Sequence, residues 1–257
     1  MDAPATAKLE KINRWLPYLA VLQSDVRATQ RSWVYRIWVL ASVLAAVGYL
    51  LFTVGIHQKA GMIQLASTVM SDLLLWTVLG SVSLIIVLTA SSISAERGTM
   101  ADSVLSRGIS RYQYFLAKLH ARLLTVIGTS LTLGGLALLG SHFFLQEDLS
   151  LSGSVVALVT VGVLLMTVTT FGVTFSAISN STLMGITLLW IILYGAGFIL
   201  TLVPTRFPSP YRMLTNLPHI LRGQYSLPEL GHLALWCLLL SVVVSLLGMA
   251  YFSRRDI

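Results

Sequence analysis

The chain has 257 residues, of which 56% are hydrophobic and only 11% are charged, and its formal net charge is +7. A soluble globular domain carries about 25% charged residues, so this composition excludes an ordinary soluble fold and indicates a protein solvated by a lipid bilayer. The basic residues lie at the ends of apolar runs, and no nucleic-acid-binding signature accompanies them. We therefore attribute the positive charge to membrane topology and lipid headgroups, and we expect no nucleic acid partner.

The N-terminal segment 1–33 is too polar for a cleavable signal peptide, but it has the pattern of an interfacial helix. Apolar residues recur at helical spacings through residues 7–33, with Lys8, Lys11 and Arg14 between them. This pattern predicts an amphipathic helix along the inner leaflet, either whole or broken at Pro17. The alternative is a solvated basic tail.

Six stretches hold the roughly 20 mostly apolar residues that a helix needs to span a bilayer. They cover residues 33–56, 69–92, 119–145, 154–178, 183–203 and 231–252. Only the polar residues 179–182 separate the fourth stretch from the fifth. We interpret them as a tight turn between two spans; the alternative is one long kinked helix, which gives five spans and puts the C-terminus outside.

The distribution of Lys and Arg predicts the orientation. Thirteen of the 17 lie in the N-terminal segment, the connection between the second and third spans with its flank, or the C-terminal tail, and four lie on the opposite side. The positive-inside rule then places both termini and that connection in the cytoplasm.

The external connection 204–230 holds five of the seven prolines, which excludes a continuous helix across it. Its middle, residues 211–221, is expected to form a short helix that rests on the outer interface.

The cytoplasmic connection, residues 93–118, is the most informative stretch. Gly98 can end one helix, Asp102 or Ser103 can start another, and Gly108 allows a break. This predicts a short amphipathic helix at the membrane surface, suited to docking a soluble partner. The alternative is an ordinary positive-inside loop that binds lipid phosphates.

Two pieces of this connection carry a resemblance to a known family. They are Glu96-Arg97-Gly98-Thr99, and then Val104-Leu105-Ser106-Arg107-Gly108-Ile109-Ser110-Arg111 with Leu116-Ala117-Lys118. This order resembles the signature of ABC transporter permeases of the type-2 exporter class, the ABC-2 family. The chain departs from it with Gly108 where proline is common and Ala117 where glycine is common.

Both ends of the chain add to the resemblance. Residues 22–38, with Asp25, Arg27 and Arg31, resemble the family's basic N-terminal elbow helix, and residues 252–257 resemble its usual arginine-aspartate ending. The resemblance extends to the layout of the whole chain as one permease domain, 1–257.

The resemblance implies a fold and a mechanism. The fold would be an all-α, six-span polytopic membrane bundle with an elbow helix and a cytoplasmic coupling helix. Two copies of a separate cytoplasmic ABC ATPase would bind the coupling helix, and their ATP-driven closure would rock two permease chains, identical or different, in a bacterial or archaeal cytoplasmic (inner) membrane. The residues expected to couple to the ATPase are Glu96, Arg97, Gly98, Thr99, Asp102, Arg107, Ser110, Arg111 and Lys118.

ATP and Mg²⁺ are expected on the partner ATPase, because this chain has no Walker-type G-x-x-x-x-G-K-[ST] sequence. We therefore expect no enzymatic activity of the chain by itself. We also expect no bound cofactor and no metal, since the histidines lack metal-ligand spacing.

Small and hydroxyl residues inside the spans give the remaining signals. Glycines in the third to fifth spans are expected to let helices pack closely. Thr160, Thr167 and Thr174 recur every seven residues in the fourth span and so share a face. We expect them to bond to their own helix; the alternative is a polar lining for a substrate route.

The sequence is compatible with three functions. The first is the permease of an ATP-driven exporter with a hydrophobic or amphipathic substrate. The second is a secondary carrier or channel, which the lack of charge at mid-membrane disfavours. The third is a membrane assembly or anchoring protein without transport.

Overall fold

The structure is a computed structural model of the chain, in which residues 15–60, 65–96, 109–145, 148–202 and 210–254 are described. Within these ranges the fold is α-helical, and six helices are long and apolar enough to cross a membrane. They are α2 (Trp33–Ala60), α3 (Ala66–Ala90), α5 (Arg111–Phe144), α6 (Leu151–Ile178), α7 (Thr182–Leu202) and α10 (Leu227–Arg254). The predicted all-α membrane bundle is confirmed at this level.

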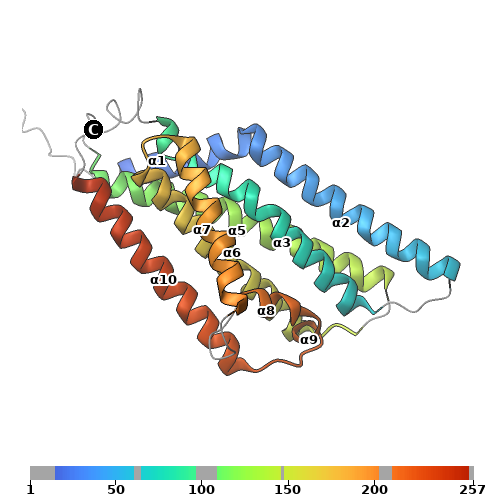
Figure 1. Cartoon of the computed structure of the whole chain (residues 1–257). Coiled ribbons are helices and arrows are strands. Elements are labelled where there is room, and N and C mark those ends of the chain that lie inside the picture. Colours follow the sequence, from blue (N-terminus) through green and yellow to red (C-terminus); the bar gives the residue numbers. More distant parts are fainter. Residues whose placement is uncertain (1–14, 61–64, 97–108, 146–147, 203–209, 255–257) are drawn as a thin grey trace, which may run out of the picture.

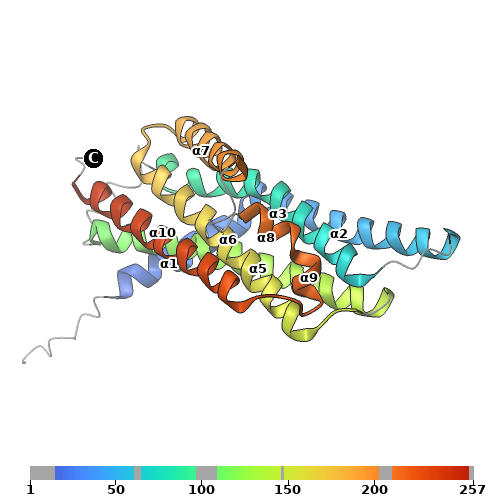
Figure 2. The same ribbon diagram turned by 60° about the horizontal axis from the view of Figure 1, so that its bottom comes forward.

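The long helices pack into one bundle with α6 at its centre (Figure 1). Helix α6 contacts α10, α5 and α3, whereas α2 and α7 lie at the margins, as the turned view in Figure 2 also shows. Because the number of long helices is even, the start of α2 and the end of α10 lie at the same end of the bundle (Figure 1).

Helices α6 and α7 are separate, so the alternative of one long kinked helix is wrong. Ser179 has an extended backbone (φ −70°, ψ 143°), which ends α6. The Ser181 hydroxyl accepts a hydrogen bond from the backbone N–H of Met184 (3.2 Å), which caps the start of α7.

Helix α5 begins at Arg111, eight residues before the predicted start of the third span. Ser110 and Gln113 form a capping box: the Ser110 hydroxyl accepts from the Gln113 N–H (3.2 Å), and the Gln113 side chain accepts from the Ser110 N–H (3.3 Å). The cap starts the helix before the apolar run begins. The apolar run by itself does not predict the first two turns of α5.

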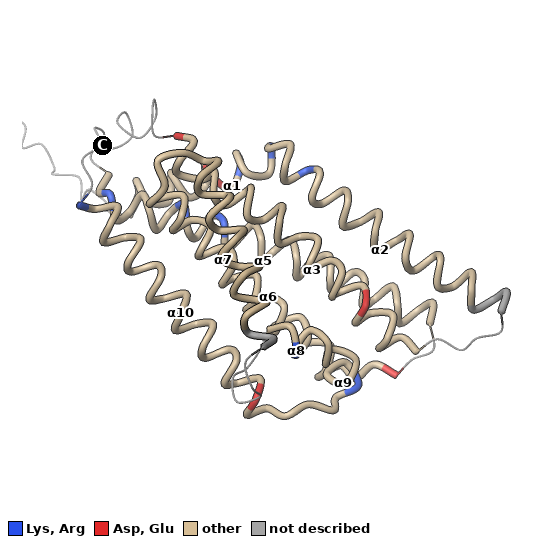
Figure 3. Tube along the Cα trace, viewed as in Figure 1, with Lys and Arg blue, Asp and Glu red and all other residues tan. Residues whose placement is uncertain are grey.

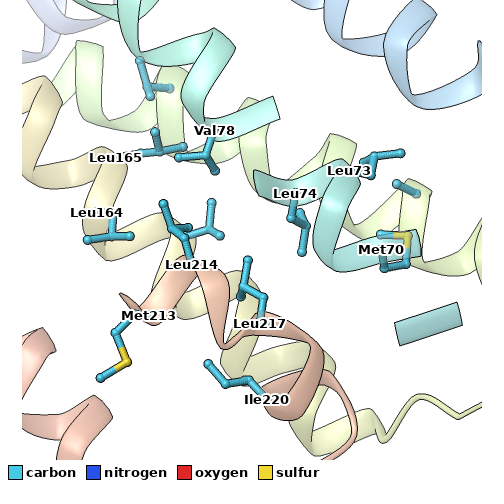
Figure 4. Close-up of a cluster of buried hydrophobic side chains, with 14 of the residues drawn as sticks. Met70, Leu73, Leu74, Val78, Leu164, Leu165, Met213, Leu214, Leu217 and Ile220 are labelled. Atoms are coloured by element: carbon cyan, nitrogen blue, oxygen red, sulfur yellow. The ribbon is translucent and has the colours of Figure 1, made fainter. Parts of the chain in front are cut away.

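Two short helices, α8 (Pro210–Thr215) and α9 (Leu217–Leu221), correct the expectation for residues 211–221. They do not rest on an interface but enter the bundle. Figure 4 shows Leu214 and Leu217 directed toward the labelled side chains of α3 and α6. The buried residues that α8 and α9 contribute to the largest apolar core are Met213, Leu214, Leu217, Ile220 and Leu221. This burial removes apolar surface that a resting helix would leave exposed.

Close backbone approach makes this packing possible. A Cβ at Gly153 would collide with the carbonyl oxygens of Ile220 and Leu221, so α6 admits α9 only because residue 153 is glycine. Similarly, a Cβ at Gly172 would collide with Thr89 of α3, and one at Gly248 would lie 2.6 Å from Thr174. Among the glycines for which the sequence predicted close helix packing, Gly134 and Gly172 show it. At Gly128, Gly135, Gly195 and Gly197 a Cβ would have nothing within 4 Å, so the prediction is wrong there.

Candidate functional site

Most of the charged residues lie toward the two ends of the bundle (Figure 3). One end, which we call the α1 end, holds helix α1 (Leu16–Arg31), the 3₁₀ turn η1 (Ser94–Glu96), the start of α5 and the end of α10. The basic residues described at that end are Arg27, Arg31, Arg36, Arg111, Lys118, Arg122 and Arg254. The opposite end, the α9 end, has Arg212 and Arg222 together with Asp148 and Glu229.

A buried ionic network joins three elements at the α1 end; we call Asp25, Glu96, Tyr114, Lys118 and Arg122 the charge cluster. The Lys118 ammonium lies 2.7 Å from an Asp25 oxygen and 2.6 Å from a Glu96 oxygen. The Arg122 Nε lies 3.4 Å from the other Asp25 oxygen. The Tyr114 hydroxyl donates to the second Glu96 oxygen at 2.5 Å. Two carboxylates thus face two cations, and the cluster is electrically balanced.

The burial of these charges makes their pairing energetically important. Asp25 and Lys118 are each 4% exposed and Arg122 is 8% exposed, while the Glu96 side chain is 33% exposed. Removing one partner of a buried pair typically costs about 3–5 kcal/mol, because the other charge stays buried without compensation. The cluster therefore holds α1, η1 and α5 in one fixed arrangement.

The cluster forms because its residues recur every four positions on two facing helices. Tyr114, Lys118 and Arg122 follow one another at this spacing on α5, and so lie on one face. On α1, Asp25 and Thr29 have the same spacing. The Thr29 hydroxyl donates to the Asp25 carbonyl (2.7 Å) and accepts from the Arg122 guanidinium (2.5 Å).

Helix α1 covers residues 16–31 of the helix predicted over residues 7–33, and residues 7–14 lie outside the described part of the chain. Pro17 lies in the first turn of α1, where proline is well tolerated, so it starts the helix and does not break it. Two polar residues of α1, Asp25 and Thr29, are buried against α5, whereas Trp15, Leu16 and Leu19 are more than half exposed. The first turn of the helix thus presents large apolar side chains outward.

The end of α10 packs onto the start of α5. Phe252 is 2% exposed, and its ring lies 6.1 Å from that of Tyr114 and 6.3 Å from that of Phe115. The Arg111 guanidinium donates to the Ser253 carbonyl at 3.2 Å. The last turn of α10 is therefore attached to the helix that carries the charge cluster.

The structure brings together some of the predicted coupling and elbow residues and separates others. Asp25, Glu96 and Lys118 meet in the charge cluster. Ser110 caps α5, and Arg111 contacts α10. The elbow residues Arg27 and Arg31 are exposed and lie outside the cluster. The remaining predicted coupling residues lie outside the described part of the chain: Arg97, Gly98, Thr99, Asp102 and Arg107.

Three members of this site were not predicted from the sequence: Thr29, Tyr114 and Arg122. The signal that could have found them is the four-residue spacing of Tyr114, Lys118 and Arg122 at the end of an apolar span. Polar side chains in that position need partners, because the neighbouring helices exclude water.

The three threonines of the fourth span face α10 and their own helix. Thr160 and Thr167 donate to the carbonyls of Val156 (2.8 Å) and Val163 (3.1 Å). Thr174 lies 3.4 Å from the Val244 carbonyl of α10. A substrate route along this face would have to run between α6 and α10, the two helices with the most extensive mutual contact.

At the α9 end, Asp148 connects three segments. Its carboxylate accepts from the Ser67 N–H (2.8 Å) and hydroxyl (2.5 Å) at the start of α3, and from Arg222 Nε (3.0 Å) after α9. Burial acts to raise the pKa of Asp148, but the hydrogen bonds from Ser67 and the charge of Arg222 outweigh it, so the pKa lies below its usual value.

No three His, Cys, Asp or Glu side chains among the described residues lie close enough to hold a metal ion. Comparison with models of known protein families and with curated proteins gives no match to this chain. The class of protein that the fold defines is therefore a helical protein with six helices able to span a membrane, and the particular function is inferred from the site.

Proposed function

We propose that this chain is the membrane-spanning permease subunit of an ATP-driven exporter of the ABC-2 type. In this proposal a separate ATPase binds the segment between η1 and α5, and two permease chains together move a hydrophobic or amphipathic substrate. The charge cluster transmits the movement of that segment into the bundle.

One observation carries the proposal: separate pieces of sequence that resemble the family converge at the α1 end. The elbow piece supplies Asp25, the piece after the second span supplies Glu96, and the following helix supplies Lys118. The C-terminal piece supplies Phe252, stacked on Tyr114. Because Lys118 of α5 contacts both Glu96 and Asp25 of α1, a force applied to the residues next to Glu96 would reach α1 and α5 together.

The charge distribution favours an orientation with the α1 end in the cytoplasm. Most of the described Lys and Arg residues lie at that end, and the positive-inside rule assigns such an end to the cytoplasmic side. A soluble ATPase could then reach the segment after η1. The outward apolar residues of α1 are suited to contact with the inner leaflet.

The direct test is to purify the full chain from its native membrane and identify co-purifying proteins. An ABC ATPase is expected in the complex, with ATP turnover that depends on the permease. The variant Arg107→Glu with Arg111→Glu is expected to reduce both co-purification and turnover. The control, Arg36→Glu with Arg212→Glu, changes the charge equally at exposed positions outside the connection and should behave like the unmodified chain.

Two results would contradict the proposal. One is that no ATPase accompanies the chain; the other is that charge reversal at Arg107 and Arg111 has no more effect than the control. Surface labelling that places the segment between η1 and α5 outside the cell would also remove the assignment.

The carrier alternative has one observation in its favour. Asp72 is the seventh residue of α3, roughly 9 Å along the helix from its start, and its carboxylate accepts from the Tyr49 hydroxyl at 3.3 Å. A carboxylate inside a span is a common feature of proton-coupled carriers. If Asp72→Asn abolished transport that persists without ATP, the carrier would be the better description; the exporter proposal expects transport to need ATP and to survive this change.

A further inference from the structure

A groove runs between α2 and α5 on the side of the bundle that α1 partly covers. It forms because α2 packs more extensively against α3 than against α5, which leaves space between α2 and α5. The part of the groove nearest α1 has a volume of about 400 Å³ and is lined by Val26 and Gln30 of α1, Tyr35 and Val39 of α2, and residues 124–133 of α5. Tyr35 and Val39 belong to the first two turns of α2, so this part of the groove lies at the end of a predicted span.

Hydroxyl groups line this part of the groove. The Tyr35 hydroxyl pairs with that of Thr129 at 2.9 Å, and Thr125 and Thr132 also face the groove while donating to their own helix. In the Tyr35–Thr129 pair one hydroxyl donates to the other, which leaves a second O–H available to a ligand. Gly128 lies between Thr125 and Thr129. A Cβ added at Gly128 would have no neighbouring atom within 4 Å, so the groove is open there.

Positive charge borders the same part. Arg27 and Arg31 are exposed, and each directly follows a lining residue of α1, Val26 or Gln30, so both lie next to the lining without being part of it. Within the described part of the chain neither arginine has a carboxylate partner at ion-pair distance. Asp25, the acidic residue of α1, faces the other way and is held by Lys118.

Beyond Leu133 the groove becomes mostly apolar, with Ser42 as the polar side chain of its lining. A second hollow of about 400 Å³ shares Leu133 and continues between α2 and α5 to Phe144. Its walls are formed by aliphatic side chains of both helices, among them Val47, Leu50 and Leu136. Along the groove, the neighbouring side chains thus change from the cations Arg27 and Arg31, through hydroxyl groups, to mostly aliphatic groups.

We propose that this groove binds one anionic phospholipid, with its phosphate at Arg27 and Arg31, its glycerol region beside Tyr35 and Thr129, and an acyl chain along α5. Charge complementarity selects an anionic headgroup, and the apolar continuation selects a lipid over a soluble phosphate. Because the lipid would contact α1, α2 and α5 together, it would stabilise the position of α1 against the bundle.

The test is native mass spectrometry of the full chain in a non-ionic detergent, titrated with phosphatidylglycerol or phosphatidylcholine. One phosphatidylglycerol is expected to be retained at concentrations where phosphatidylcholine is not. Arg27→Gln with Arg31→Gln is expected to weaken retention by about tenfold or more, because each cation near a membrane surface contributes substantially to anionic lipid binding. The matched control, Arg212→Gln with Arg254→Gln, removes the same charge from exposed positions on α8 and α10, which contribute nothing to the groove lining.

A second pair of variants tests the groove without changing any charge. Gly128→Leu fills it, and Gly195→Leu adds the same side chain to α7, where the position is equally open. Loss of phosphatidylglycerol in Gly128→Leu but not in Gly195→Leu supports the proposal. Equal retention of the two lipids by the unmodified chain, or equal retention by each variant and its control, would overturn it, since the bound lipid would then be an unselective layer around the bundle.

Discussion

The short helices at the two ends of the bundle are held by different interactions. At the α1 end, α1 is fixed to α5 through buried charges, with Lys118 between Asp25 and Glu96. At the α9 end, α8 and α9 are fixed through apolar side chains such as Leu217 that enter the core, and the ion pair there is partly exposed. A buried ion pair is directional and fails when one partner is lost, whereas an apolar contact depends on fit and volume.

This difference suggests a division of roles. The charge cluster fixes a unique register of α1 against α5, because each cation has specific partners. The α8–α9 segment fills space between α3 and α6 and can adjust by small side-chain movements. Under the proposed function, the directional end is the one that would receive force from the ATPase.

The largest expected effect comes from breaking the charge cluster. Lys118→Ala leaves Asp25 and Glu96 without their shared cation and should lower the free energy of unfolding by about 3–5 kcal/mol. Thermal unfolding of the purified chain measures this. Arg254→Ala, an exposed control near the same end, should change stability by less than about 0.5 kcal/mol.

A double variant sharpens this prediction. Combining Lys118→Met with Asp25→Asn removes both charges of one pair, so it should cost less than the sum of the two single changes. Additive effects would mean that Lys118 and Asp25 do not interact as their 2.7 Å separation indicates.

Truncation in the apolar α9 end should have the next largest effect. Leu217 is fully buried, and Leu217→Ala should destabilise the protein by about 2–5 kcal/mol by creating a cavity. Leu239 on α10 is half exposed on the bundle surface and serves as the control for Leu→Ala. If the two variants unfolded at the same temperature, α9 would not be part of the core.

A smaller effect is expected at the start of α5. Ser110→Ala removes the hydroxyl that accepts the hydrogen bond from the Gln113 N–H. It should lower the free energy of unfolding by about 1 kcal/mol. Ser110→Asp keeps a capping acceptor and should retain most of the stability. Hydrogen exchange of the first turn of α5 provides a local readout, and protection that is unchanged in Ser110→Ala would contradict the role of the cap.

The smallest effect is expected from Asp148, whose ion pair with Arg222 is partly exposed and worth about 0–1 kcal/mol. Because its pKa is lowered in the folded protein, its contribution is present above the usual aspartate value of about 4 and is lost as the pH falls through the lower folded value. Unfolding temperatures between pH 7 and pH 3 should therefore fall slightly less steeply in Asp148→Asn. An identical pH dependence in both proteins would remove this role.

The sequence by itself determined the number and approximate limits of the spanning helices. Apolar runs of this length have few alternatives, because a bilayer requires every backbone polar group to be satisfied within a helix. A helix before the first span and the turn between α6 and α7 also followed from local pattern, through the spacing of apolar residues and through the polar residues 179–182, although the sequence did not show that Pro17 starts that helix.

Only the tertiary structure decided which side chains meet. Asp25 and Lys118 are 93 residues apart, and no local periodicity relates them. The same holds for α8 and α9, whose apolar residues were expected at an interface and lie in the core because Gly153 lets α6 approach them. Helix formation is governed by neighbours along the chain, but the pairing of buried charges and the filling of a core depend on contacts that exist only once the helices have packed.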